Sequence, residues 1–126
     1  SSDVCSSDLF INNVSGTYKL SFAVSTNGTT TTEYDSSGIT LTTNTWYHIA
    51  YVKSTSTLTF YLNGSSVGSN TITTNGYYSG TGGLAVGGVY NTTAYNFPGF
   101  LDDLRITDYA RYTTSFTPPT SALSTF

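Results

Sequence analysis

The stretch TLTFYLNG, residues 57–64, alternates hydroxyl-bearing with apolar side chains and ends on an Asn-Gly pair. In a strand, this alternation places Leu58, Phe60 and Leu62 on one inward face, with Thr57, Thr59 and Tyr61 outward. The pair Asn63-Gly64 supplies the positive backbone torsions of a two-residue turn, so residues 66–68 should return antiparallel to residues 60–62. The stretch therefore predicts a β-hairpin with one apolar face.

The same period of two recurs along most of the chain, and helical periodicity is absent. Further strands are predicted over residues 18–25, 39–41, 46–53, 84–86 and 100–106. The run from Trp46 to Lys53 has large side chains on both faces, which predicts a central strand that is covered on both sides. Many short strands separated by turn signals predict an all-β, two-sheet antiparallel sandwich.

Composition excludes several classes of protein. The chain has 126 residues, which is enough for one domain, and aromatics at 15% with charged residues at 9% argue against intrinsic disorder. With four Lys and Arg and a net charge of −3, a nucleic-acid partner is excluded. No apolar run is long enough to insert in a membrane. The 25 Thr and 18 Ser predict a hydroxyl-rich, weakly charged surface.

The first nine residues stand apart. The string SSDVCSSDL, residues 1–9, matches the in-frame translation of a widely used short-read sequencing adapter, and it shows neither strand alternation nor a signal-peptide layout. A natural Ser-rich linker is the alternative. We predict that residues 1–9 are adapter-derived and that the domain proper, residues 10–126, is incomplete at its N-terminus. Cys5 would then belong to the artefact.

Four segments, taken in order, resemble a known family. They are WYHIAYV at 46–52, LTFYLNG at 58–64, LAVG at 84–87 and FPGFLDDLRI at 97–106. Together they resemble the laminin G-like branch of the concanavalin A-like lectin/glucanase superfamily, and residues 110–120 are similar to the tail of such domains in bacteriophage and bacterial surface proteins. The resemblance implies a jelly-roll sandwich whose first strands are missing here. The strand at 100–106 would then present an unpaired edge and an exposed apolar face.

The resemblance also includes glycosidases, which need two carboxylates flanking the scissile bond. Their motif is E-x-D-x-x-E. Here Glu33 and Asp35 begin it, but Gly38 stands where the second glutamate should be, and Glu33 is the only glutamate. Asp35 is expected to be a solvated loop acid. His48 is the lone histidine, so no His triad or multi-His metal site is available, and we expect a packed, hydrogen-bonded core histidine. The chain is not expected to be an enzyme.

Two adjacent acids lie in the predicted closing strand, where their side chains would point to opposite faces. We expect Asp102 to bind backbone amides at the sheet edge and Asp103 to pair with Arg105. The alternative is calcium, which oxygen-rich loops hold in the resembling family. Ca²⁺ is therefore a possible cofactor, with no ligand assigned.

Tyrosines in Gly/Thr/Asn-rich loops are the candidate binding residues. The set is Tyr77, Tyr78, Tyr90, Asn91 and Tyr95. Exposed aromatic rings stack on sugar faces, and the same composition suits protein-binding loops. We therefore predict a non-catalytic recognition or adhesion module that binds a glycan or cell-surface protein, within a larger phage virion or bacterial extracellular chain. A purely structural virion spacer and an accessory module of a secreted polysaccharide-degrading enzyme remain alternatives.

Overall fold

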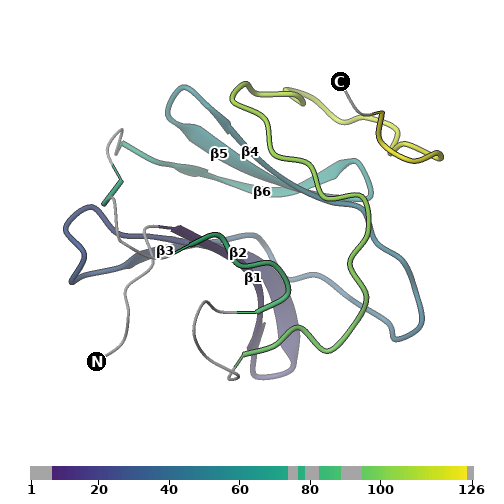
Figure 1. Ribbon diagram of the computed structural model, residues 1–126, viewed down its shortest axis with the longest axis horizontal. Coiled ribbons are helices and arrows are strands. Elements are labelled where there is room, and N and C mark those ends of the chain that lie inside the picture. The colour runs from purple at the N-terminus through teal and green to yellow at the C-terminus, as the bar shows by residue number, and fades with distance from the viewer. Residues whose placement is uncertain (1–6, 74–76, 79–82, 89–94, 125–126) are drawn as a thin grey trace.

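The chain folds into two three-stranded antiparallel sheets, stacked as two layers in Figure 1. The computed structural model describes residues 7–73, 77–78, 83–88 and 95–124. Sheet A contains β1 (Ser7–Val14), β2 (Thr17–Val24) and β3 (Thr32–Asp35) in that order; sheet B contains β4 (Ile49–Ser54), β5 (Thr57–Leu62) and β6 (Ser65–Thr71). The all-β, two-sheet antiparallel prediction is confirmed. Within the described ranges no helix is long and apolar enough to cross a bilayer.

Two tight hairpins determine the strand pairing. Between β5 and β6, Asn63 and Gly64 have φ of 50° and 81°, which confirms the predicted turn. Between β1 and β2, Ser15 and Gly16 have φ of 52° and 86° and make an equivalent turn, which was not predicted from the sequence. Strand β1 includes residues 7–9, so these three residues do pair as a strand, although their sequence lacks alternation. Their adapter origin stays a prediction.

The core lies between the two sheets. Its buried members are Leu20 from β2, Leu58 and Phe60 from β5, and Ile72 after β6. Tyr51 from β4 packs edge-on against Phe60 at 5.4 Å between ring centroids, and its hydroxyl donates a hydrogen bond to the Phe10 carbonyl in sheet A at 3.0 Å. Burial raises the pKa of the Tyr51 phenol, so the hydroxyl stays a donor.

The predicted long strand over 46–53 is shorter than expected. Strand β4 begins at Ile49, and in the described part of the chain it pairs with β5 alone, so it is an edge strand rather than a central one. Trp46 is 68% exposed. It lies before the first residue of β4, and the chain leading to it turns at Asn44, which has a left-handed φ of 57°. The C-terminal segment covers part of the outer face of sheet B, where Phe116 packs on Tyr61 and binds the Gly64 carbonyl.

The C-terminal part of the chain forms no strand in the described residues, which corrects two predictions. Residues 84–86 and 100–106 are irregular, and their apolar side chains are exposed, Phe100 by 86% and Leu104 by 64%. Asp103 has a φ of 51°, which is incompatible with an extended strand. Figure 1 shows the segment after residue 95 running from beside sheet A up to sheet B. The predicted strand at 39–41 is likewise reduced to one isolated bridge between Ile39 and Tyr18.

Candidate functional site

The tyrosines predicted to bind are exposed where the structure describes them. Tyr77 and Tyr78 are 43% and 42% exposed, and Tyr95 is 86% exposed. Tyr90 and Asn91 lie outside the described residues. In Figure 1, residues 77–78 lie at the left beside the loop that follows β2, whereas the segment starting at residue 95 begins at the lower side of sheet A. The exposed tyrosines therefore occupy two separate places on the molecule.

Tyr78 is held in place although its ring faces solvent. Its backbone N–H donates to the Ser25 carbonyl at 2.9 Å. The ring lies directly over Gly28, because a Cβ added at this glycine would stand 2.7 Å from the ring carbon Cζ. The loop beneath is itself ordered by Asn27, whose Oδ1 accepts the backbone N–H groups of Thr29 and Thr30 at 2.9 Å each. This arrangement presets the position of an exposed aromatic ring.

The two acids of the incomplete glycosidase motif lie in a strand, so the prediction of a solvated loop acid at Asp35 is wrong. Asp35 ends β3 opposite Ser21 of β2, and its carboxylate accepts hydrogen bonds from Ser21 Oγ at 2.6 Å and from Lys19 Nζ at 3.2 Å. The Ser21 hydroxyl, together with the Lys19 charge, holds the pKa of Asp35 below its ordinary value. Glu33, on the same face, accepts from Asn12 Nδ2 at 2.9 Å.

His48 packs against the C-terminal segment rather than in the main core. Its ring meets Phe116 edge-on at 5.4 Å and Tyr112 at 6.3 Å. The Nδ1 atom is buried and has no hydrogen-bond partner among the described residues, so the expected packing is found but the expected hydrogen bond at this nitrogen is not. Burial lowers the pKa of the imidazole below its ordinary value of 6.5.

The stability of the chain should therefore depend on pH through His48. Because its folded-state pKa is lowered, its contribution is present above about pH 6.5 and is lost as the pH falls below that value. We expect the urea unfolding midpoint to drop between about pH 7 and pH 5, and to drop less in His48→Phe. The pKa of Asp35 is also lowered, but the stability that this carboxylate contributes is lost only below about pH 4. It therefore does not affect the unfolding midpoint between about pH 7 and pH 5. Equal slopes in both proteins would contradict the assignment.

Sheet B carries a groove on its outer face. The groove has a volume of about 330 Å³. It is lined by Val52, Ser54, Thr55, Thr57, Thr59, Tyr61, Tyr112 and Thr113. We call it the hydroxyl groove. The alternation of residues 57–62 predicts Thr57, Thr59 and Tyr61 on this outer face. No local signal predicts that Tyr112 joins them, because that contact depends on where the C-terminal segment docks.

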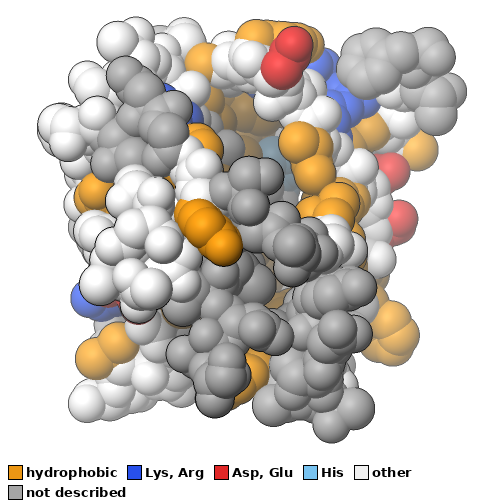
Figure 2. Space-filling view, turned by 60° about the vertical axis from the view of Figure 1, so that its left-hand side comes forward, with side chains coloured by type: hydrophobic (Ala, Val, Ile, Leu, Met, Phe, Trp, Pro, Cys, Tyr) orange, Lys and Arg blue, Asp and Glu red, His pale blue; other side chains and the backbone are white. Residues whose placement is uncertain are grey.

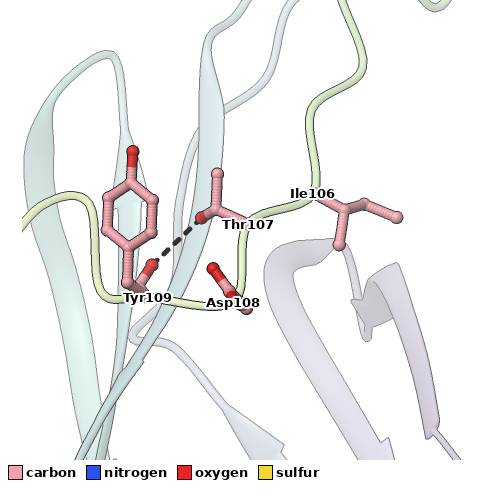
Figure 3. A pocket seen from close by; sticks show the side chains of 4 residues that line it. All are labelled: Ile106, Thr107, Asp108 and Tyr109. Carbon is pink, nitrogen blue, oxygen red and sulfur yellow. Dashed lines mark hydrogen bonds between the residues drawn. The ribbon is translucent and has the colours of Figure 1, made fainter. Parts of the chain in front are cut away.

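A second, larger hollow of about 560 Å³ is lined by four consecutive residues, Ile106, Thr107, Asp108 and Tyr109. Figure 3 shows Ile106 pointing away from the other three side chains, and the Thr107 hydroxyl donating to the Tyr109 carbonyl at 3.0 Å. A single stretch of chain supplies the whole lining, and the Thr107 hydroxyl is already bound to the Tyr109 carbonyl. Because polar groups in ligand sites usually converge from several elements, this hollow is a weaker candidate than the groove on sheet B.

The adjacent acids Asp102 and Asp103 lie in irregular backbone rather than in the predicted strand. Asp102 Oδ1 accepts the backbone N–H of Asp103 at 2.9 Å, so it does bind a backbone amide, although not at a sheet edge. The Arg105 guanidinium donates to the Ser124 carbonyl at 2.9 Å. Across the described ranges, no group of three or more His, Cys, Asp and Glu side chains could hold a metal ion. Calcium therefore has no assigned ligands.

Comparison with known proteins places the chain in a family. A solved structure of an S-layer domain-containing protein (residues 221–444) from Clostridium thermocellum ATCC 27405 is similar at 27% sequence identity and a TM-score of 0.44. The match covers 86% of this chain and 60% of that one, so this chain spans less than two thirds of it. No curated protein gives a significant match. A family model for laminin G domains matches residues 4–114, and the chain therefore belongs to the concanavalin A-like lectin/glucanases superfamily.

Proposed function

We propose that this domain is a non-catalytic recognition and adhesion module that binds a glycan or a cell-surface protein through exposed aromatic loop residues. The observation that carries the proposal is Tyr78. Tyr78 is 42% exposed, yet its ring rests on Gly28 and its backbone N–H is bound to the Ser25 carbonyl. An aromatic ring that is exposed and already fixed loses little conformational entropy on binding, which favours a role in recognition.

The surface chemistry supports a neutral ligand. Among the residues that Figure 2 colours by type, most are uncharged, and the few Lys, Arg, Asp and Glu side chains lie near the margins of the face. With a net charge of −3 and four basic residues, the chain lacks the positive surface that a nucleic-acid partner requires. Thr, Ser and Asn side chains can both donate and accept hydrogen bonds, which suits hydroxyl-rich or peptide ligands.

The absence of catalysis is part of the proposal. A glycosidase acid must hold a proton at neutral pH, which requires a raised pKa. The pKa of Asp35 is shifted the other way, and its carboxylate is occupied by Ser21 and Lys19. His48 meets the aromatic rings of Tyr112 and Phe116, and its Nδ1 is buried. These side chains serve packing and sheet pairing better than proton transfer.

We further propose that the domain works at a virion or bacterial cell surface, as one part of a larger chain. Membership of a family named for lectins and glucanases supports an extracellular binding role. A purely structural spacer is the competing function, and the experiment below separates the two.

The test uses fluorescently labelled domain on a bacterial polysaccharide array and on intact bacterial cells. We expect the double variant Tyr77→Ala/Tyr78→Ala to lose binding by about tenfold or more, the usual cost of removing anchoring aromatics. Tyr109→Ala, a change at another exposed tyrosine, is the matched control and should bind like the parent. A parent domain that binds neither the array nor the cells would contradict the proposal and favour a spacer.

A further inference from the structure

We infer that the hydroxyl groove on sheet B is a second binding site, one that takes a neutral saccharide without a metal ion. This site is separate from the loop tyrosines of the proposed function. Tyr78 contacts Ser25 and Gly28 in the loop after β2, whereas the groove is built by β4, β5 and the C-terminal segment. The inference can therefore fail or succeed independently of the loop proposal.

The floor of the groove follows from the strand register. Val52 is paired with Thr59, and Ser54 is paired with Thr57. Side chains two residues apart share a face, so these four project together from the outer side of sheet B. The alternate residues Leu58 and Phe60 point into the core and fix β5 from the other side. The hydroxyls of Thr57 and Thr59 therefore lie on β5, a strand that is fixed by its packing in the core.

The wall of the groove is aromatic and is fixed by the C-terminal segment. Tyr112 stacks on Phe116 with ring centroids 3.5 Å apart and planes within 7°. Phe116 packs in turn on Tyr61 at 5.4 Å, and its backbone N–H donates to the Gly64 carbonyl at 3.0 Å. Tyr112 itself remains half-buried, so part of its side chain faces the groove. The wall is therefore in place before any ligand arrives.

The lining selects the chemical class of the ligand. Seven of the eight side chains carry a hydroxyl, the eighth is Val52, and none is charged. Hydroxyls donate and accept hydrogen bonds, so they match the hydroxyls of a sugar. An apolar ligand would leave several of them unpaired, and an ionic ligand would find no countercharge. Tyr112 offers ring surface to the C–H groups of a sugar. No Asp, Glu or His lines the groove, so a metal ion has no ligands there.

The size of the groove limits the length of the bound segment. A volume of about 330 Å³ lies at the lower end of the range of small-molecule sites, about 300–1,000 Å³. We therefore expect about one or two sugar rings to be held, with the rest of an oligosaccharide extending into solvent, and an affinity in the millimolar range.

The test is a two-dimensional ¹H–¹⁵N NMR titration of the whole chain in EDTA. The probes are cellohexaose, laminarihexaose, maltohexaose and mannohexaose, each added to about 10 mM, where a millimolar ligand saturates its site. We expect at least one of these neutral hexaoses to shift the amide signals of residues 52–59 and 112–113. Thr59→Val should weaken that binding by about tenfold, because it removes one hydroxyl and keeps the branched shape.

Matched variants make the outcome decisive. Thr59→Ser keeps the hydroxyl and should retain binding, and Thr32→Val, the same change on exposed β3, should have no effect. Tyr77→Ala/Tyr78→Ala should also leave these shifts unchanged, which separates this site from the loop site. The inference is overturned if no hexaose shifts the groove signals, if Thr59→Val binds like the parent with an unchanged melting temperature, or if binding requires calcium.

Discussion

Gly64→Ala should lower the free energy of unfolding by about 2–5 kcal/mol, because the new methyl group meets two penalties at once. Gly64 has a φ of +81°, a conformation that costs an alanine about 1–2 kcal/mol. A Cβ at this position would also fall on the backbone carbonyl of Phe116, well inside van der Waals contact. The measurement is urea unfolding of the parent and the variant. The C-terminal segment should also be displaced from sheet B in the variant.

Gly16→Ala is the matched control for this prediction. Gly16 occupies the same position of the equivalent β1–β2 turn with a φ of +86°, but a Cβ there would meet nothing within 4 Å. Gly16→Ala should therefore lower the free energy of unfolding only by the cost of the positive φ, about 1–2 kcal/mol. The difference between the two variants measures the contact between the turn and the C-terminal segment. Equal losses would show that Phe116 does not dock on Gly64.

The second large effect is expected at Phe60, which is fully buried between the sheets. Phe60→Ala should lower the free energy of unfolding by about 3–5 kcal/mol, since it removes a ring that packs against Tyr51 and leaves a cavity. Leu104→Ala is the control, because Leu104 is 64% exposed and its truncation should cost no more than about 0.5 kcal/mol. A cost at Leu104 similar to that at Phe60 would mean that residues 100–106 are packed in a sheet and are not irregular and exposed.

Local signals in the sequence were sufficient for the hairpin of β5 and β6 and for β2. The alternation of apolar residues and the Asn63-Gly64 turn depend only on residues close in sequence. These elements can therefore be predicted without knowing which distant segment packs on them. The β1–β2 turn was not predicted, although Ser15-Gly16 is also a pair typical of turns. A hairpin needs a strand on each side of the turn, and the start of β1, Ser7–Leu9, shows no alternation of apolar and polar residues. Strand β3 was missed because Thr and Ser surround Glu33 and Asp35 and resemble a loop.

The features that could not be predicted from the sequence depend on contacts between segments far apart in the chain. Alternation in residues 100–106 predicts a strand only if a neighbouring strand supplies hydrogen bonds, and none does so in the part of the chain that the structure describes. The hydroxyl groove also depends on a contact between distant segments. The outward positions of Thr57 and Thr59 could be read from period two, but Tyr112 reaches them only because Phe116 docks on Gly64 and Tyr61. Exposure of Tyr77 and Tyr78 was predictable from their loop composition, whereas the anchoring of Tyr78 on Gly28 was not.

The pairing of strands only with their neighbours in sequence has a consequence for how the chain assembles. Each sheet is a meander of consecutive hairpins, so its hydrogen bonds close short loops at small entropic cost. The links between sheets span much more chain: the Tyr51–Phe10 hydrogen bond joins residues 41 apart, and Asn70–Asp35 joins residues 35 apart. The two meanders can therefore form as separate units. The slow step of folding is then expected to be their docking, with the C-terminal segment seated last.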